Sequence, residues 1–282
     1  MLVGSCFVQD ALGPAPTLDL TTGPDTNTVL HLFAHADILS TICLPNRRPA
    51  FTFVRPSGGP SAHLGCHSGL PGGLLILLAE TSALSVDMLQ LDPGVVRDRA
   101  DQIEREIKGW SSMVSGSNGV VGIGRLDATV SEEMWRLVGL DVLPIFAPSP
   151  ADQRCSCFVL PSQTALIHLA TAVRRLGPLS RTLQSCLADM LALGAHAHTY
   201  DAHSSPYENA IRACPWTIAS MLALTDEDQA TCRAALEEFG PQQVYKDNLA
   251  AVEAVWEQTS SRGWTVNWRE VLAQRSMVIA FQ

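Results

Sequence analysis

Two histidines and a carboxylate lie close together in the first quarter of the chain. His31 and His35 are four positions apart, which places both imidazoles on one face of a helix, and Asp37 follows them directly. Such a pair can bind a metal ion, but a zinc site needs further ligands, and the sequence offers no third ligand for this pair. The other interpretations are two hydrogen-bonded structural histidines, or a pocket wall with acid–base or hydrogen-bonding chemistry.

Two consecutive arginines, Arg47 and Arg48, follow this segment. A guanidinium group can hold a carboxylate or polarise a carbonyl group. The structural alternative is that their positive charge stabilises the C-terminus of the preceding helix. The sequence does not decide which arginine faces a pocket, or whether Trp216 belongs to the core or lines a cavity. The predicted catalytic residues are therefore His31, His35, Asp37 and Arg47. The predicted ligand-binding residues are Arg48 and Trp216.

The remaining candidates for metal or cofactor chemistry lack essential parts. The pair Cys155 and Cys157 has no second close pair, which structural zinc sites normally provide. The segment 122–124 lacks the lysine and the preceding strand of a phosphate-binding loop. Three histidines and one aspartate lie close together in a polar stretch, namely His196, His198, Asp201 and His203. We interpret them as solvated loop residues rather than as metal ligands, because no residue that would orient such ligands is apparent. We predict neither a metal nor a cofactor.

Apolar residues recur at helical spacing along most of the chain. They predict a helix from Thr28 that Pro45 ends, a helix from Asp92-Pro93 to residue 108, and another that Thr225 caps. The other predicted helices cover 74–89, 131–144, 162–176, 179–193, 207–224, 243–258 and 267–274, and we predict a loop over 147–153. Residues 1–27 are predicted to form an irregular leader and residues 28–282 a single all-α domain of about nine to ten helices.

The composition excludes several classes of protein. A net charge of −9, with only 19 Lys and Arg in 282 residues, argues against direct binding to DNA. The longest apolar run is short and contains Pro and Gly, so we predict neither a membrane span nor a signal peptide. The eight cysteines are scattered through apolar stretches, which is typical of buried free thiols. These features indicate a cytoplasmic or nuclear protein.

Three stretches resemble the regulatory domain of fungal zinc-cluster transcription factors. The first is His31-Leu32-Phe33-Ala34-His35-Ala36-Asp37-Ile38-Leu39 with the later Arg47-Arg48-Pro49, and the second is Cys214-Pro215-Trp216-Thr217-Ile218-Ala219. The third is Val255-Trp256-Glu257 with Asn267-Trp268-Arg269-Glu270-Val271-Leu272. The six closely spaced cysteines of a zinc cluster are missing from this sequence. The resemblance therefore implies a fragment, a truncated regulator, or a domain with another use.

Two functions are compatible with this resemblance. The first is a cofactor-independent cyclase or isomerase of fungal secondary metabolism, such as an intramolecular Diels–Alderase, because a shaped apolar cavity can hold a reactive conformer and polarise one carbonyl group. The alternative is a regulator of transcription that binds an effector or a partner and has no DNA-binding module of its own. The expected ligand is an apolar small molecule, and a homodimer is compatible with the sequence.

Overall fold

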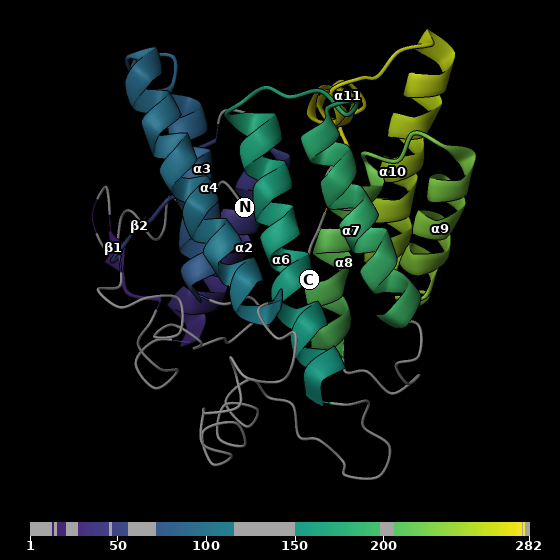
Figure 1. The fold of residues 1–282 in the computed structure, drawn as a ribbon, viewed down its shortest axis with the longest axis horizontal. Coiled ribbons are helices and arrows are strands. Elements are labelled where there is room, and N and C mark those ends of the chain that lie inside the picture. Colours follow the sequence, from purple (N-terminus) through teal and green to yellow (C-terminus); the bar gives the residue numbers. More distant parts are fainter. Residues whose placement is uncertain are drawn as a thin grey trace.

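The computed structural model describes residues 13, 16–20, 28–44, 47–55, 72–115, 150–197, 206–277 and 279. Within the helices, the side chains of residues 28–29, 31–32, 110–115, 150–159, 193–197 and 206–212 are not described. Nine helices and two very short strands account for most of these residues, which confirms the all-α prediction (Figure 1). The helices are α2 Thr28–Cys43, α3 Gly72–Asp87, α4 Pro93–Ser115, α6 Pro150–Ala172, α7 Arg181–Ala197, α8 Pro206–Ser220, α9 Asp226–Glu237, α10 Gln243–Arg262 and α11 Trp268–Gln274, and the strands are β1 Thr17–Leu18 and β2 Thr52–Phe53.

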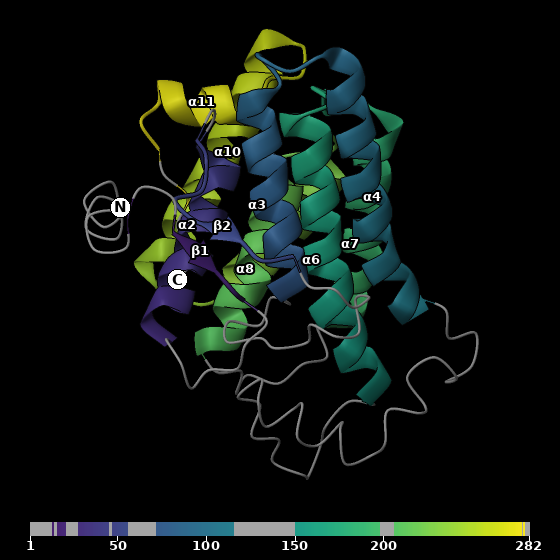
Figure 2. The same cartoon turned by 90° about the vertical axis from the view of Figure 1, so that its left-hand side faces the viewer.

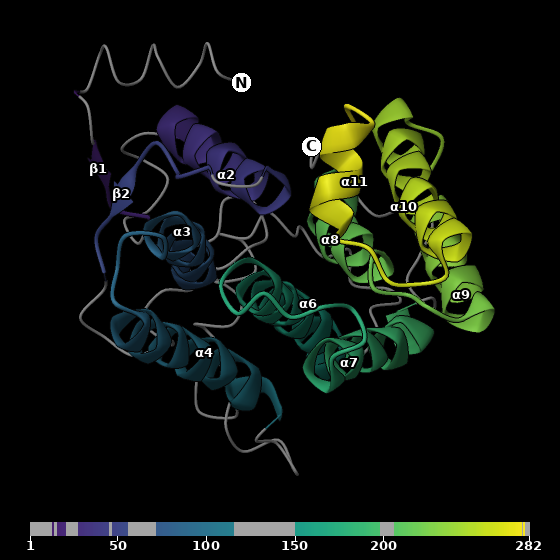
Figure 3. The same cartoon turned by 90° about the horizontal axis from the view of Figure 1, so that it is seen from above.

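The long helices lie side by side along one direction (Figures 1 and 2). Helix α6 is central, since it contacts α3, α4, α7 and α8. The view from above shows α2, α3 and α4 on one side of α6, and α8, α9, α10 and α11 on the other (Figure 3). The connections α3–α4, α6–α7 and α10–α11 all lie at the same end of the bundle, which we call the upper end (Figures 1 and 2).

Side-chain caps explain where several helices begin. The Asp92 carboxylate accepts a hydrogen bond of 2.7 Å from the Gly94 N–H at the start of α4, and Thr225 accepts one of 3.1 Å from the Asp228 N–H at the start of α9. At α11 the Asn267 side chain accepts from the Arg269 N–H at 3.1 Å. These bonds satisfy N–H groups that have no partner within the helix. The predicted caps at Asp92 and Thr225 are thereby confirmed.

Several predicted helix boundaries are wrong. Helix α6 begins at Pro150, inside the predicted loop 147–153, and it continues through Pro161 before ending at Ala172. Pro161 is buried, so packing of this segment against its neighbours compensates for the backbone hydrogen bond that proline cannot donate. Helices α4 and α10 also extend beyond the predicted ends, to Ser115 and Arg262. The predicted helix 131–144 lies outside the described residues.

Part of the predicted leader pairs with the helical domain. Strand β1 runs parallel to β2, with Thr17 opposite Thr52 and Leu18 opposite Phe53. The hydroxyl oxygens of Thr17 and Thr52 are 2.9 Å apart. The segment before α2 is therefore held against the segment that follows it.

The core contains apolar residues from all nine described helices. Trp216 and Trp268 are each 2% exposed and are among its largest members. Four cysteines within the described ranges are free and buried, as predicted for them, namely Cys43, Cys186, Cys214 and Cys232.

Within the described ranges, no helix combines the length and the hydropathy that crossing a bilayer requires.

Candidate functional site

Two of the predicted site residues form an ion pair in which the carboxylate is buried. Asp37 lies in α2 with its side chain 1% exposed, and its Oδ1 is 2.6 Å from Nη2 of Arg47. Its other oxygen, Oδ2, accepts a hydrogen bond of 2.6 Å from the Ala50 N–H. Arg47 Nη1 also donates to Ser40 Oγ at 2.8 Å. The carboxylate thus holds the segment after α2 back against the helix.

The protonation of Asp37 depends on opposing influences. Burial raises the pKa of this carboxyl group above its usual value, whereas the Ala50 N–H and the Arg47 guanidinium act in the opposite direction. The ionised form of Asp37 depends strongly on Arg47, because burying a charge without a partner of opposite charge destabilises the folded state.

His35 contributes a shielded nitrogen to the same helix. Part of the residue reaches the surface, but Nε2 is buried and has no hydrogen-bond partner among the described residues. Burial lowers the pKa of His35 to about 4, so the imidazole is neutral near pH 7. An unpaired buried nitrogen is unfavourable, and it is the kind of atom that can meet a ligand. His31 lies one turn earlier in α2, but its side chain is not described.

The other predicted site residues lie elsewhere. Arg48 is exposed and forms an ion pair with Asp87 at the end of α3. Trp216 is part of the core in α8. The structure therefore brings Asp37 and Arg47 together, places His35 two residues before Asp37 on α2, and separates Arg48 from Asp37 by pairing it with a different carboxylate.

The pKa of His35 predicts a pH dependence of stability. Because this pKa falls from 6.5 to about 4 on folding, the unfolded chain binds the proton more readily between these values. The free energy of unfolding should therefore decrease as the pH is lowered from 6.5 towards 4. In His35→Phe this decrease should be smaller, as measured by urea unfolding at a series of pH values. A pH profile identical to that of the wild type would contradict the assignment of His35 as a buried neutral residue.

A second polar group, which the sequence analysis did not single out, surrounds Arg269 of α11. This arginine is only 6% exposed. Its Nε donates to the carbonyl oxygen of Ile42 at 2.8 Å, and Nη1 donates to Thr171 Oγ1 at 2.8 Å. Nη2 is 2.9 Å from His168 Nδ1, and the guanidinium lies over the Trp268 ring at 4.3 Å. Neutral groups and an aromatic face thus stabilise this cation.

The contact with Arg269 determines which ring nitrogen of His168 carries the proton. A guanidinium only donates, so Nδ1 must accept, and the ring proton lies on Nε2. Nε2 is 2.8 Å from Ser82 Oγ, which in turn is 2.6 Å from Thr41 Oγ1. Burial lowers the pKa of His168 well below its usual value, and the charge of Arg269 acts in the same direction. This group, which we call the Arg269 network, connects α2, α3, α6 and α11.

The Arg269 network joins the helix that carries the first family-like stretch to the third such stretch. The carbonyl of Ile42 belongs to the last turn of α2, and Arg269 belongs to the stretch 267–272. Burial lowers the pKa of Arg269 to about 10. The guanidinium nevertheless stays charged near pH 7, which suits the negative end of the α2 dipole.

The family model of the fungal-specific transcription factor domain matches residues 7–281. The chain belongs to this family. The matched range includes the Asp37–Arg47 ion pair and the whole Arg269 network. Searches of curated proteins and of solved structures gave no significant match.

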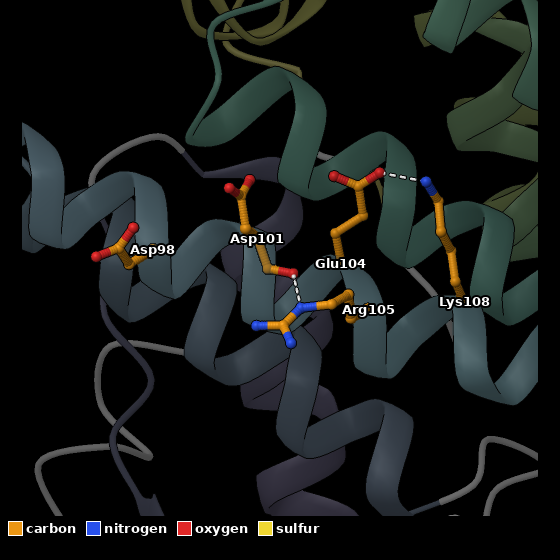
Figure 4. Close-up of a pocket in the computed structure, with 5 residues that line it drawn as sticks. All are labelled: Asp98, Asp101, Glu104, Arg105 and Lys108. Atoms are coloured by element: carbon orange, nitrogen blue, oxygen red, sulfur yellow. Dashed lines mark hydrogen bonds and ion pairs between the residues drawn. The ribbon is translucent and has the colours of Figure 1, made fainter.

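The surface hollows among the described parts of this transcription factor domain include one on α4 and one beside α11. The hollow on α4 is lined by the charged side chains of Asp98, Asp101, Glu104, Arg105 and Lys108 (Figure 4). Lys108 Nζ is 2.5 Å from Glu104 Oε1, so part of this charge is already paired. The other hollow lies where α10 meets α11, near Trp264. Neither is lined by a predicted site residue.

The described side chains of this transcription factor domain contain no group of three or more His, Cys, Asp or Glu residues placed to hold a metal ion. His198, Asp201 and His203 lie outside the described residues. His196 lies near the end of α7, and its side chain is not described.

Proposed function

We propose that this chain is a regulatory interaction domain that binds an effector or a partner protein and affects transcription indirectly. The observation that carries this proposal is the match of the transcription-factor domain family to residues 7–281. The site geometry is in agreement, because Asp37 binds Arg47 and the Ala50 N–H, which is the arrangement of a structural ion pair. Fold alone does not determine function, so the proposal needs a direct test.

Location and partners belong to the same proposal. We infer that the domain acts in the nucleus or cytoplasm, does not contact DNA directly, and binds an apolar effector or forms a homodimer. A net charge of −9 supports the absence of direct DNA contact, because a polyanion is repelled by an acidic surface.

The regulatory function can be tested by tethering the chain to an unrelated DNA-binding domain in a fungal host. Transcription of a reporter with the matching site should differ from that given by the DNA-binding domain alone. The control is a variant that destabilises the fold, Arg269→Ala, which should lose the effect. Equal reporter transcription with and without the tethered chain, at equal protein levels, would contradict the proposal.

One observation favours a second candidate, a cofactor-independent cyclase or isomerase such as a Diels–Alderase. The unpaired Nε2 of His35 could hydrogen-bond a substrate carbonyl group and polarise it. Incubation with metabolites from neighbouring biosynthetic genes should then give a cyclised or isomerised product, and His35→Phe should lower its rate of formation. Unchanged conversion by the variant would remove His35 from this role.

A further inference from the structure

Two exposed apolar side chains lie in connections at the upper end of the bundle. Among the described residues, Leu89 and Leu179 are the two most exposed large apolar side chains, at 78% and 72%. Leu89 lies in the α3–α4 connection and Leu179 in the α6–α7 connection, and both connections lie at the upper end (Figures 1 and 2). Exposed apolar groups indicate an interaction surface only where they belong to one surface, so the contacts between the two connections matter here.

Unpaired positive charge accompanies these leucines. Residues 173–181 contain three arginines and no acidic residue, although the net charge of the chain is −9. Arg174 forms ion pairs with Asp101 and Glu104 of α4. Arg175 and Arg181 are exposed and have no carboxylate partner among the described side chains. The α6–α7 connection is therefore basic, whereas the chain as a whole is acidic.

A hydrogen bond joins the two connections. Arg175 Nη2 is 3.9 Å from the sulfur of Met88, which directly precedes Leu89. A thioether is a weak acceptor, so this contact brings the two connections together and leaves the charge of Arg175 available. We call the surface formed by Leu89, Arg175, Leu179 and Arg181 the upper patch.

The backbone of the α6–α7 connection is held in one conformation. The Leu176 N–H donates to the Ala170 carbonyl at 2.9 Å, and Arg175 has a φ of 55°, in the left-handed region that usually favours glycine at this position. Beside Leu179, the Gln184 side chain donates to the Pro178 carbonyl at 2.8 Å. A surface that is ordered before binding loses less conformational entropy on association.

We propose that the upper patch binds an acidic peptide segment of a partner protein, with apolar side chains of the peptide against Leu89 and Leu179 and its carboxylates paired with Arg175 and Arg181. This inference rests on the proposed regulatory function. Charge complementarity selects the acidic partner. A nucleic acid fits less well, because exposed leucines offer nothing to a phosphate backbone and the chain is acidic elsewhere.

The inference can be tested by fluorescence anisotropy with a short labelled peptide of Asp, Glu, Leu and Phe. The full chain should bind it, and should not bind a version with Lys in place of every acidic residue. Leu179→Asp and Arg181→Glu should each weaken binding by about tenfold or more. The matched controls, Val54→Asp just after β2 and Lys246→Glu in the first turn of α10, should bind as the wild type does.

Arg175→Gly separates binding from stability. Glycine adopts a φ of 55° without steric strain, so the melting temperature should stay the same or rise. Peptide affinity should nevertheless fall, because a guanidinium of the upper patch is lost. If Arg175 were only a structural residue, this variant would bind the peptide as tightly as the wild type does.

The outcomes distinguish this inference from the proposed function. Wild-type affinity in Leu179→Asp, Arg181→Glu and Arg175→Gly would overturn the inference, and so would failure of the wild type to bind the acidic peptide. Binding of duplex DNA that the same variants abolish would also overturn it, by assigning the upper patch to a nucleic acid. A reporter effect of the tethered chain that persists in these variants would leave the regulatory function intact while rejecting the patch.

Discussion

Replacing Arg269 with alanine should lower the free energy of unfolding by about 3 kcal/mol or more, the largest loss that we expect from a single substitution. The change removes hydrogen bonds to the Ile42 carbonyl, Thr171 and His168, and it leaves the Ile42 carbonyl and His168 buried without this donor. It also leaves a space beside Trp268. Urea unfolding monitored by tryptophan fluorescence would measure the effect.

Two further variants make the Arg269 prediction specific. Arg269→Lys should recover only part of the loss, because an ammonium group cannot reproduce the planar arrangement of donors. Arg275→Ala removes an arginine just after α11 that is 40% exposed and pairs with Glu257. As an exposed pair it should contribute less than about 1 kcal/mol. If Arg269→Ala and Arg275→Ala lowered the free energy of unfolding equally, the importance of the Arg269 network would be contradicted.

Removing Arg47 should have the second largest effect, a loss of about 3 kcal/mol near neutral pH. Arg47→Ala leaves Asp37 buried with only the Ala50 N–H and without its cation. Because burial already raises the pKa of Asp37, the folded state takes up the proton more readily than the unfolded state. The loss should therefore be largest at neutral pH and should shrink as the pH falls and Asp37 becomes neutral.

A double variant tests whether the loss comes from the stranded charge. Asp37→Asn combined with Arg47→Ala removes both charges and keeps an acceptor for Ala50, so it should be more stable than Arg47→Ala alone near neutral pH. Arg48→Ala breaks only the exposed pair with Asp87 and should cost less than about 1 kcal/mol. If the double variant is no more stable than Arg47→Ala, the buried carboxylate is not the cause.

Local sequence signals predicted much of the fold. The spacing of apolar residues gave the helices, and short polar side chains such as Asp92 and Thr225 marked helix starts, because a cap acts over only a few residues. The same local rule failed at Pro161, where packing by distant segments maintains a helix that the proline alone would end.

The site was less predictable, because its contacts are not local. The sequence placed Asp37 and Arg47 in one region, but it could not show that Arg48 faces a different carboxylate, Asp87. The Arg269 network was missed altogether, since Arg269 and His168 are 101 positions apart. One signal was available: Arg269 lies three positions before Leu272 on a helix, so it shares a face with an apolar residue.

The bond between Arg269 and Ile42 spans 227 positions of the chain. At synthesis rates of about 5–20 residues per second, the ribosome needs roughly 10–45 s after completing α2 before it has added Arg269. During this time the last turn of α2 lacks its hydrogen-bond partner on α11, although α3, the helix that α2 contacts, has already been synthesised. The hydrogen bond that connects α2 to α11 therefore forms only late, after the C-terminal helices have been made.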